Sequence, residues 1–360
     1  MKRALFILFG LVITLVLLDK VWQRKRASKG EIVNPSGTNG VASRTVPTRL
    51  QRAIEPLQIA STNSSTTNED EVTEWKKLSR EQVEAYLLKT KRSPESLLNA
   101  FIETGDTNFL NEAVQKYPDN SIVQWTMLNR ASPEERAQWL KKLRASSPDN
   151  ALPNYLSALD NFKAGKTDQA LAEIDSASKK KLSASEQERA QSREEMYLLA
   201  GYSPLEAKTQ SMETLILPNL AEMKSLAQEI SSLQQKYKAA GDNSSAQQLA
   251  AVGIEIGSKV ADGKSSPTLI HQLVGYAMEN IALKNLDAGT YYDFLGKTAG
   301  ERFQEIKTQK QEVKDLIPVH TELYPRLSDA EKMIYLDRLK LYGELNAIKW
   351  LKRNYGGETK

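Results

Sequence analysis

From residue 74 onward, apolar side chains recur at spacings of three and four residues, which is the period of an amphipathic helix. One such stripe contains Tyr155 and Leu159, and a second contains Met223 and Ile230. The strict alternation of apolar and polar residues that marks a half-buried strand is almost missing. We therefore predict an all-α fold for this part of the chain.

Serine capping boxes mark where these helices begin. In a capping box the serine side chain binds the first turn, and an acid or amide three residues later binds back. The spacing occurs at Ser79…Gln82, Ser132…Glu135, Ser183…Glu186, Ser203…Glu206 and Ser328…Glu331. Serine followed by proline, which suits the first helical position, occurs at 93–94, 132–133, 203–204 and 266–267. Beyond residue 182 the pattern predicts helices over 184–201, 219–240, 243–262, 267–285, 288–314 and 329–354.

Turn glycines divide the helices into hairpins. Gly105, Gly165 and Gly241 each follow a helical stretch, where glycine adopts the left-handed conformation at least cost. Ala170 and Ala246 lie five positions after the second and third of these glycines. A small residue there lets the second helix cross the first closely. We predict a series of helical hairpins, including one that turns at Gly241.

The hairpin over Pro148–Ala177 carries small residues at regular positions. They are Ala158, Gly165, Ala170 and Ala177, and the preceding 148–150 segment repeats the Pro-Asp-Asn of 118–120 at a distance of thirty residues. This segment resembles a tetratricopeptide repeat, with a spacing shorter than the usual 34. The resemblance implies an α-solenoid of such hairpins over 73–182, with a concave surface that binds a protein or peptide. A hairpin array without a peptide groove is the alternative.

The N-terminus differs from the rest of the chain. Ala4–Leu18 is fifteen residues without a charge, and the bulky, basic segment 19–26 offers no small-residue cleavage site. Extended to Trp22, the apolar stretch reaches nineteen residues, close to the length of a transmembrane helix. We predict an uncleaved signal anchor over 1–26 that crosses the membrane through residues 4–22. Cleavage and secretion is the alternative.

A linker and a helical body follow the anchor. Residues 27–72 are rich in Ser, Thr, Asn, Gly and Pro, and such composition buries too little apolar surface to order the chain. Longer helical hairpins form a C-terminal domain over 183–360. A short basic start before an apolar segment is typical of an export signal, so we predict a single-pass protein with an extracytoplasmic, periplasmic body. The larger number of basic residues after the apolar segment favours the alternative of a cytoplasmic body.

The net charge of +4 is unevenly distributed. Residues 1–30 carry seven basic residues and one acid, whereas the other 330 carry 42 basic and 44 acidic residues. A nucleic-acid-binding protein would carry its positive charge along one face of the body. We therefore expect no nucleic acid among the partners.

Several kinds of chemistry are excluded by composition. Without cysteine there is no disulfide, thiolate metal site or cysteine nucleophile. The only histidines are His271 and His320, which lack metal-ligand spacing. His271 lies among apolar residues and is expected to be buried. His320 follows Pro318 and is expected in a turn.

Other polar motifs also have structural explanations. Gly-Lys-Ser/Thr triplets occur at 165–167, 263–265 and 296–298, but each lacks the earlier glycine and the strand of a phosphate-binding loop. We interpret their glycines as helix ends. The acidic groups at 186–188 and 194–195 are expected on solvated helix faces.

Two apolar groups have structural explanations. Tyr291, Tyr292 and Phe294 stand at the start of the helix predicted over 288–314 and are assigned to core filling. Leu341 and Ile348 belong to the apolar face of the helix predicted over 329–354, which would cover one end of the array.

The sequence thus predicts no catalytic, cofactor-binding or metal-binding residues, no cofactor, and a chain that is not an enzyme. We expect a membrane-anchored, bacterial-type helical-repeat protein that scaffolds or recruits an unidentified protein or peptide on a concave helical surface. One alternative is an all-α enzyme or enzyme accessory acting on cell-envelope polymers, which a deep pocket with two convergent carboxylates would favour. Another is a purely structural spacer, which a closed bundle without a groove would favour.

Overall fold

The computed structural model describes residues 77–182, 186–212, 219–262 and 268–357. These residues belong to one compact unit, Lys77–Lys360. The predicted anchor (1–26), its membrane span (4–22) and the linker (27–72) lie outside the described residues. Among the helices that are described, none combines the length and apolar character needed to cross a membrane.

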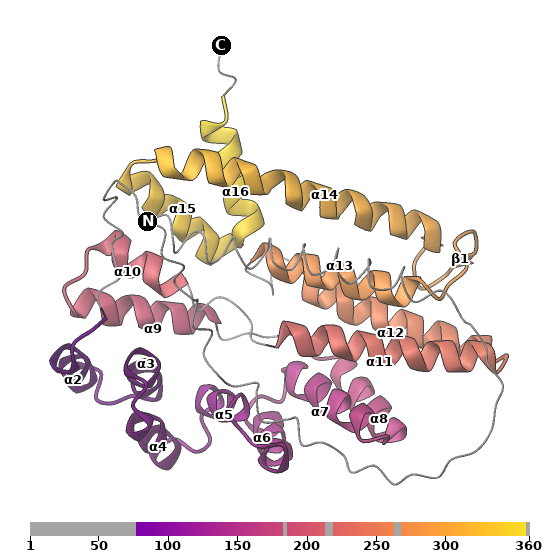
Figure 1. The fold of residues 1–360 in the computed structure, drawn as a ribbon, viewed down its shortest axis with the longest axis horizontal. Helices are drawn as coiled ribbons and strands as arrows, with labels where there is room; N and C mark the ends of the chain where they lie inside the picture. The colour runs from indigo at the N-terminus through magenta and orange to yellow at the C-terminus, as the bar shows by residue number, and fades with distance from the viewer. Residues whose placement is uncertain (1–76, 183–185, 213–218, 263–267, 358–360) are drawn as a thin grey trace, which may run out of the picture. The chain divides into compact units, whose positions relative to one another are not determined.

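The fold is all-α, as predicted (Figure 1). The first helices are α2 (Arg80–Lys89), α3 (Pro94–Thr104), α4 (Thr107–Lys116), α5 (Ser121–Leu128), α6 (Pro133–Ser146), α7 (Leu152–Lys163) and α8 (Thr167–Ser178). They are followed by α9 (Glu186–Leu199), α10 (Pro204–Ser211), α11 (Leu220–Ala239), α12 (Asn243–Ala261) and α13 (Leu269–Leu283). The last elements are β1 (Tyr291–Tyr292), β2 (Lys297–Thr298), α14 (Ala299–Leu323), the 3₁₀ turn η2 (Tyr324–Arg326), α15 (Asp329–Tyr342) and α16 (Glu344–Tyr355).

The local signals in the sequence explain where many of these helices begin and end. Complete capping boxes begin α2 at Ser79, α6 at Ser132, α10 at Ser203 and α15 at Ser328. The predicted starts at 183–186 and 266–267 involve residues outside the described part of the chain. Gly105, Gly165 and Gly241 have φ angles of 71°, 73° and 83°. They occupy the turns of the hairpins α3–α4, α7–α8 and α11–α12, which confirms the prediction for these turns.

The helix predicted over 288–314 is wrong at its start. Residues 291–298 form a small antiparallel hairpin in which Tyr291 pairs with Thr298. Gly296 provides its turn with a φ of 64°, and α14 begins only at Ala299. Thr298 caps α14 in a box with Glu301, so the capping threonine rather than the aromatic residues defines the helix start.

The end of the chain differs from the prediction in three ways. His320 lies inside α14, which continues past Pro318 to Leu323, so the predicted turn is wrong. The helix predicted over 329–354 is two helices, because Gly343 with a φ of 81° ends α15 and precedes α16. Leu341 is 67% exposed and does not fill the core.

The helices pack around two large apolar clusters. Side chains of α5–α8 and α11–α13 form the first cluster. Side chains of α2–α5, α9 and α10 form the second, because α9 returns to pack on α2 and α3. The long helices α11–α14 contact one another in chain order, and Figure 1 shows them running roughly along one direction. Contacts therefore cross residue 182, and the division there into two domains stays a prediction.

Candidate interaction site

A hollow of about 460 Å³ lies where α9 packs against α2 and α3. Its position depends on the return of α9 to the N-terminal hairpins, so residues about a hundred positions apart share one site. The lining residues are Tyr86, Thr90, Ser93, Glu95, Glu188, Gln191, Ser192 and Glu195. We call this site the acidic hollow.

A hydrogen-bonded group of three polar side chains connects the helices around the acidic hollow. Asn99 of α3 donates from Nδ2 to Oη of Tyr86 on α2 at 3.1 Å, and to Oγ of Ser192 on α9 at 2.9 Å. The Tyr86 and Ser192 hydroxyls are 3.2 Å apart. Tyr86 and Asn99 are buried, so these bonds satisfy groups that would otherwise be costly to remove from water. The group therefore fixes the relative positions of α2, α3 and α9.

The charge of the acidic hollow has one sign. Glu95, Glu188 and Glu195 line it, and no Lys or Arg is among its lining residues. Burial raises the pKa of Tyr86, and the negative charges of Glu195 and Glu95 raise it further. The arrangement offers carboxylate acceptors around neutral hydroxyls, which suits a cationic group of a ligand.

One edge of the acidic hollow is the α2–α3 connection, which has an unusual backbone. Lys91 and Arg92 have φ angles of 53° and 52°, in the left-handed region that costs a residue with a Cβ roughly 1–2 kcal/mol. Thr90 and Ser93 on either side of this pair line the hollow. The connection therefore needs compensating contacts.

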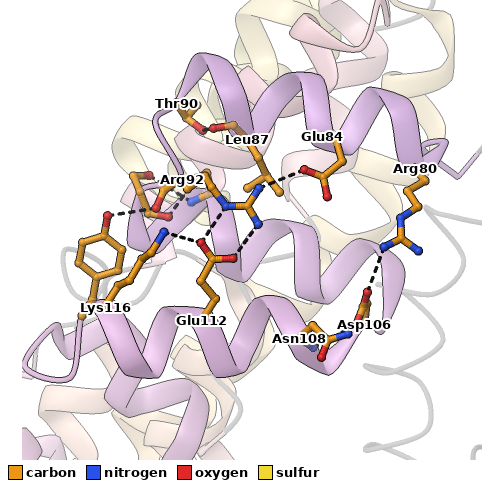
Figure 2. Close-up of polar contacts among 12 residues, drawn as sticks. Arg80, Glu84, Leu87, Thr90, Arg92, Asp106, Asn108, Glu112 and Lys116 are labelled. Carbon is orange, nitrogen blue, oxygen red and sulfur yellow. Dashed lines mark hydrogen bonds and ion pairs between the residues drawn. The ribbon is translucent and has the colours of Figure 1, made fainter.

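Arg92 makes those contacts through an ion-pair group (Figure 2). Its Nε and Nη2 donate to the two carboxylate oxygens of Glu112 on α4 at 2.7 and 2.6 Å, and Nη1 donates to Glu84 at 3.0 Å. Lys116 also donates to Glu112 at 2.7 Å. The hydrogen bond from Arg92 lowers the pKa of Glu112 to about 2. Tyr117 donates to the Arg92 carbonyl oxygen at 3.1 Å, so backbone and side chain are both held.

The face of α9 next to the acidic hollow is also fixed by charged groups, and Lys340 of α15 contacts both the lining residue Gln191 and Glu194. Glu194 lies 3.6 Å from Lys208 of α10 and 3.2 Å from Lys340 of α15, and its side chain is only 12% exposed. Glu194 was expected on a solvated face, and that expectation is wrong because lysines of α10 and α15 pair with it in a largely buried position. Its neighbour Glu195 is exposed and lines the acidic hollow.

Both histidines are buried, and neither lines the acidic hollow. His271, at the start of α13, places Nδ1 2.7 Å from the Thr268 hydroxyl, and its predicted burial is confirmed. His320 stacks on Tyr324 at 5.0 Å between ring centroids. Burial lowers the pKa of each histidine to about 4. Within the described ranges, no group of three or more His, Asp or Glu residues is arranged to hold a metal ion.

The Gly-Lys-Ser/Thr triplets have different positions in the fold. Gly165 follows the end of α7, as predicted, and the 263–265 triplet lies outside the described residues. Gly296 lies in the β1–β2 turn and not at a helix end, so that interpretation is wrong. Lys297 pairs there with Glu305 at 2.5 Å, and Thr298 caps α14.

Sequence reasoning missed most residues of the acidic hollow. The sequence singles out the acidic groups at 186–188 and 194–195, and Ser93 as a helix start, but does not place any of them in a common site. Glu188, Ser192 and Glu195 recur at helical spacing, and this polar stripe was the available signal. Tyr86 and Glu95 gave no comparable signal, because their role depends on the long-range return of α9.

The fold and the hollow define the chain as an all-α protein of helical hairpins with an acidic site between distant helices. Comparison with known protein families, curated protein sequences and solved structures gives no match to the chain.

Proposed function

We propose that this chain is a non-catalytic scaffold or recruitment protein that binds a partner protein through the acidic hollow. The observation that carries the proposal is the set of three glutamates that line a hollow with the buried Tyr86, without a lining cation. A lysine or arginine side chain of the partner fits this chemistry, because an ion pair inside a hollow is screened less than one in open solvent.

The tetratricopeptide resemblance supports the same function. Ala158, Ala170 and Ala177 are completely buried where α7 and α8 pack together, which is the role of small residues in such repeats. The hairpins α3–α4, α5–α6 and α7–α8 follow one another in the chain. In the proposed protein these hairpins form a solenoid, residues 4–22 anchor the chain in a membrane, and the body lies outside the cytoplasm.

Site-specific crosslinking tests the proposal. A photoreactive amino acid replaces Gln191, which lines the hollow, in the full chain in its native membrane. We expect one discrete crosslinked partner, joined through a segment that contains Lys or Arg. The variant Glu95→Gln/Glu195→Gln removes two charges with little change of shape, and recovery should fall roughly tenfold because charged hydrogen bonds are lost.

A matched control removes two charges elsewhere. Asp175 and Glu312 are exposed, and the variant Asp175→Asn/Glu312→Gln should leave recovery of the partner unchanged. Equal recovery from wild type and from the hollow variant would overturn the proposal. If no partner crosslinks at all, the structural spacer becomes the better description.

A second candidate function rests on the same carboxylates. Enzymes that cleave glycosidic bonds use a pair of carboxyl groups, and Glu95, Glu188 and Glu195 offer three in one hollow. An all-α enzyme or enzyme accessory acting on envelope polymers would therefore use this site. Mass spectrometry of purified cell-wall polymer incubated with the full chain separates the two functions. Released fragments that disappear with Glu95→Gln/Glu195→Gln would support the enzyme, and intact polymer would support the scaffold.

A further inference from the structure

A second hollow, of about 580 Å³, lies on the last two helices and has the opposite charge. Its lining residues are Arg338 and Tyr342 of α15 and Asn346, Lys349, Lys352 and Arg353 of α16. We call it the basic hollow. It shares no residue with the acidic hollow.

The basic hollow follows from helical spacing and from the break at Gly343. Arg338 and Tyr342 are four residues apart on α15, and Asn346, Lys349 and Arg353 have spacings of three and four on α16. Each set therefore shares one helix face. Gly343, with a φ of 81°, separates the two helices, which pack together and bring both faces to one hollow.

The four cations of the basic hollow form no ion pair with any described residue, whereas neighbouring cations do. In the same α15, Lys332 pairs with Asp329 and Lys340 pairs with Glu194. No Asp or Glu lines the hollow. Four like charges around one concave site repel one another, and a bound anion would relieve that repulsion.

Arg338 is held in a fixed orientation. Its guanidinium carbon lies 4.7 Å from the centre of the Trp350 ring, and Trp350 in turn contacts the Tyr355 ring edge-on at 5.5 Å. The Nε of Arg338 is buried and has no hydrogen-bond partner among the described residues. Since the buried Nε is out of reach of a ligand in the hollow, the planar guanidinium held on this ring is suited to binding two oxygens of one anion through Nη1 and Nη2.

We infer that the basic hollow binds the phosphate group of a phosphate ester. Arg338 supplies the guanidinium that binds two phosphate oxygens, and Lys349, Lys352 and Arg353 supply the remaining positive charge. The same phosphate oxygens are offered by a soluble phosphate ester and by the headgroup of an anionic lipid. The experiment therefore has one arm for each source.

The absence of cysteine makes a single-site fluorescent label possible. Leu341 is 67% exposed, lies next to Tyr342 and does not line the hollow, so Leu341→Cys carries an environment-sensitive fluorophore beside the site. The full chain is titrated in neutral detergent with glycerol phosphate at constant ionic strength. In the second arm it is placed in phosphatidylcholine nanodiscs with and without phosphatidylglycerol.

We expect a saturable fluorescence change in at least one arm. Lys349→Ala/Arg353→Ala should weaken it roughly tenfold, and Arg338→Lys, which keeps the charge but loses the guanidinium, should weaken it several-fold. The control Lys307→Ala/Lys314→Ala removes two exposed cations of α14 and should change the affinity less than about twofold.

The two arms identify the source of the phosphate. Saturation by glycerol phosphate supports a soluble ester, and a variant-sensitive change that requires phosphatidylglycerol supports a lipid headgroup. The inference is overturned if neither arm gives a change, or if the α14 control weakens binding as much as the hollow variant. Neither result bears on the acidic hollow, which these variants leave intact.

Discussion

At the scale of single residues, the two histidines define a pH range in which the protein loses stability. His271 and His320 are buried and their pKa values are lowered to about 4. In the unfolded chain a histidine has a pKa near 6.5, so between about pH 6.5 and 4 the unfolded state binds more protons than the folded state. The free energy of unfolding should therefore fall as the pH is lowered from about 6.5 to 4, by up to roughly 3 kcal/mol per histidine.

Urea unfolding of the full chain between pH 4 and 8 measures this loss. His271→Asn keeps a partner for Thr268, and His320→Phe keeps the ring beside Tyr324, so the double variant should show a much flatter profile between pH 6.5 and 4. A carboxylate such as Glu112, with a pKa of about 2, contributes from about pH 5 downward, so the slope between about pH 6.5 and 5 isolates the histidines. An unchanged slope in the double variant would contradict the assignment to the histidines.

The left-handed pair Lys91–Arg92 allows a second residue-scale prediction, because both residues have nearly the same φ. Arg92 forms ion pairs (Figure 2), whereas no ion pair of Lys91 is seen among the described residues. Lys91 is exposed, so Lys91→Gly should relieve backbone strain and stabilise the fold by about 0.5–1 kcal/mol. Arg92→Gly relieves the same strain but removes the ion pairs to Glu84 and Glu112, and should destabilise by about 1–2 kcal/mol. Chemical denaturation checks both, and equal effects would show that the ion pairs contribute little.

At the scale of elements, the closest helix packing is that of α12 against α13. A Cβ on Gly275 would lie 2.5 Å from the Gly257 carbonyl oxygen and 2.5 Å from the Ala261 amide nitrogen. Glycine to alanine usually stabilises a helix by about 1 kcal/mol, but here backbone atoms of the facing helix occupy the space. Gly275→Ala should therefore destabilise the protein by about 1–3 kcal/mol in thermal unfolding. Gly289→Ala, which meets no atom within 4 Å, is the control and should have little effect.

The elements also show which parts of the fold local sequence can predict. The turn glycine Gly241 and apolar periodicity predicted α11 and α12 within one or two residues, because these signals act within a helix or a turn. Periodicity failed over 288–314, where aromatic residues at helical spacing belong to a β-hairpin. It also failed at Gly343, where a backbone conformation rather than a change of pattern separates α15 from α16.

At the scale of the whole compact unit, the sites depend on contacts between distant segments. The acidic hollow requires Tyr86 and Ser192, which are 106 residues apart, and the sequence contains no local feature that pairs them. The same holds for Glu194 and Lys340, 146 residues apart. The sequence places acidic residues on α9, but this packing decides whether each faces solvent, a hollow or another helix.

A charged network connects these distant segments and leads to the last prediction. Lys208 of α10, whose side chain is 9% exposed, pairs with Glu194 of α9 and with Asp337 of α15. Lys208→Met keeps the apolar stem but leaves both carboxylates without this cation, at a cost of about 1–3 kcal/mol because Asp337 is half exposed. Hydrogen exchange should become faster in α9, α10 and α15 together, since the network is their shared contact.

Lys332 offers a matched comparison. It has the same exposure of 9% but pairs only with Asp329 of its own helix, at 3.4 Å. Lys332→Met should therefore change hydrogen exchange near the start of α15 and leave α9 and α10 as they are. If the two variants gave the same exchange pattern, the loss of a buried lysine would account for both effects. The charged network would then not couple α9 and α10 to the C-terminal helices. A difference confined to Lys208→Met would show that three ion-paired helices, distant in sequence, respond as one unit.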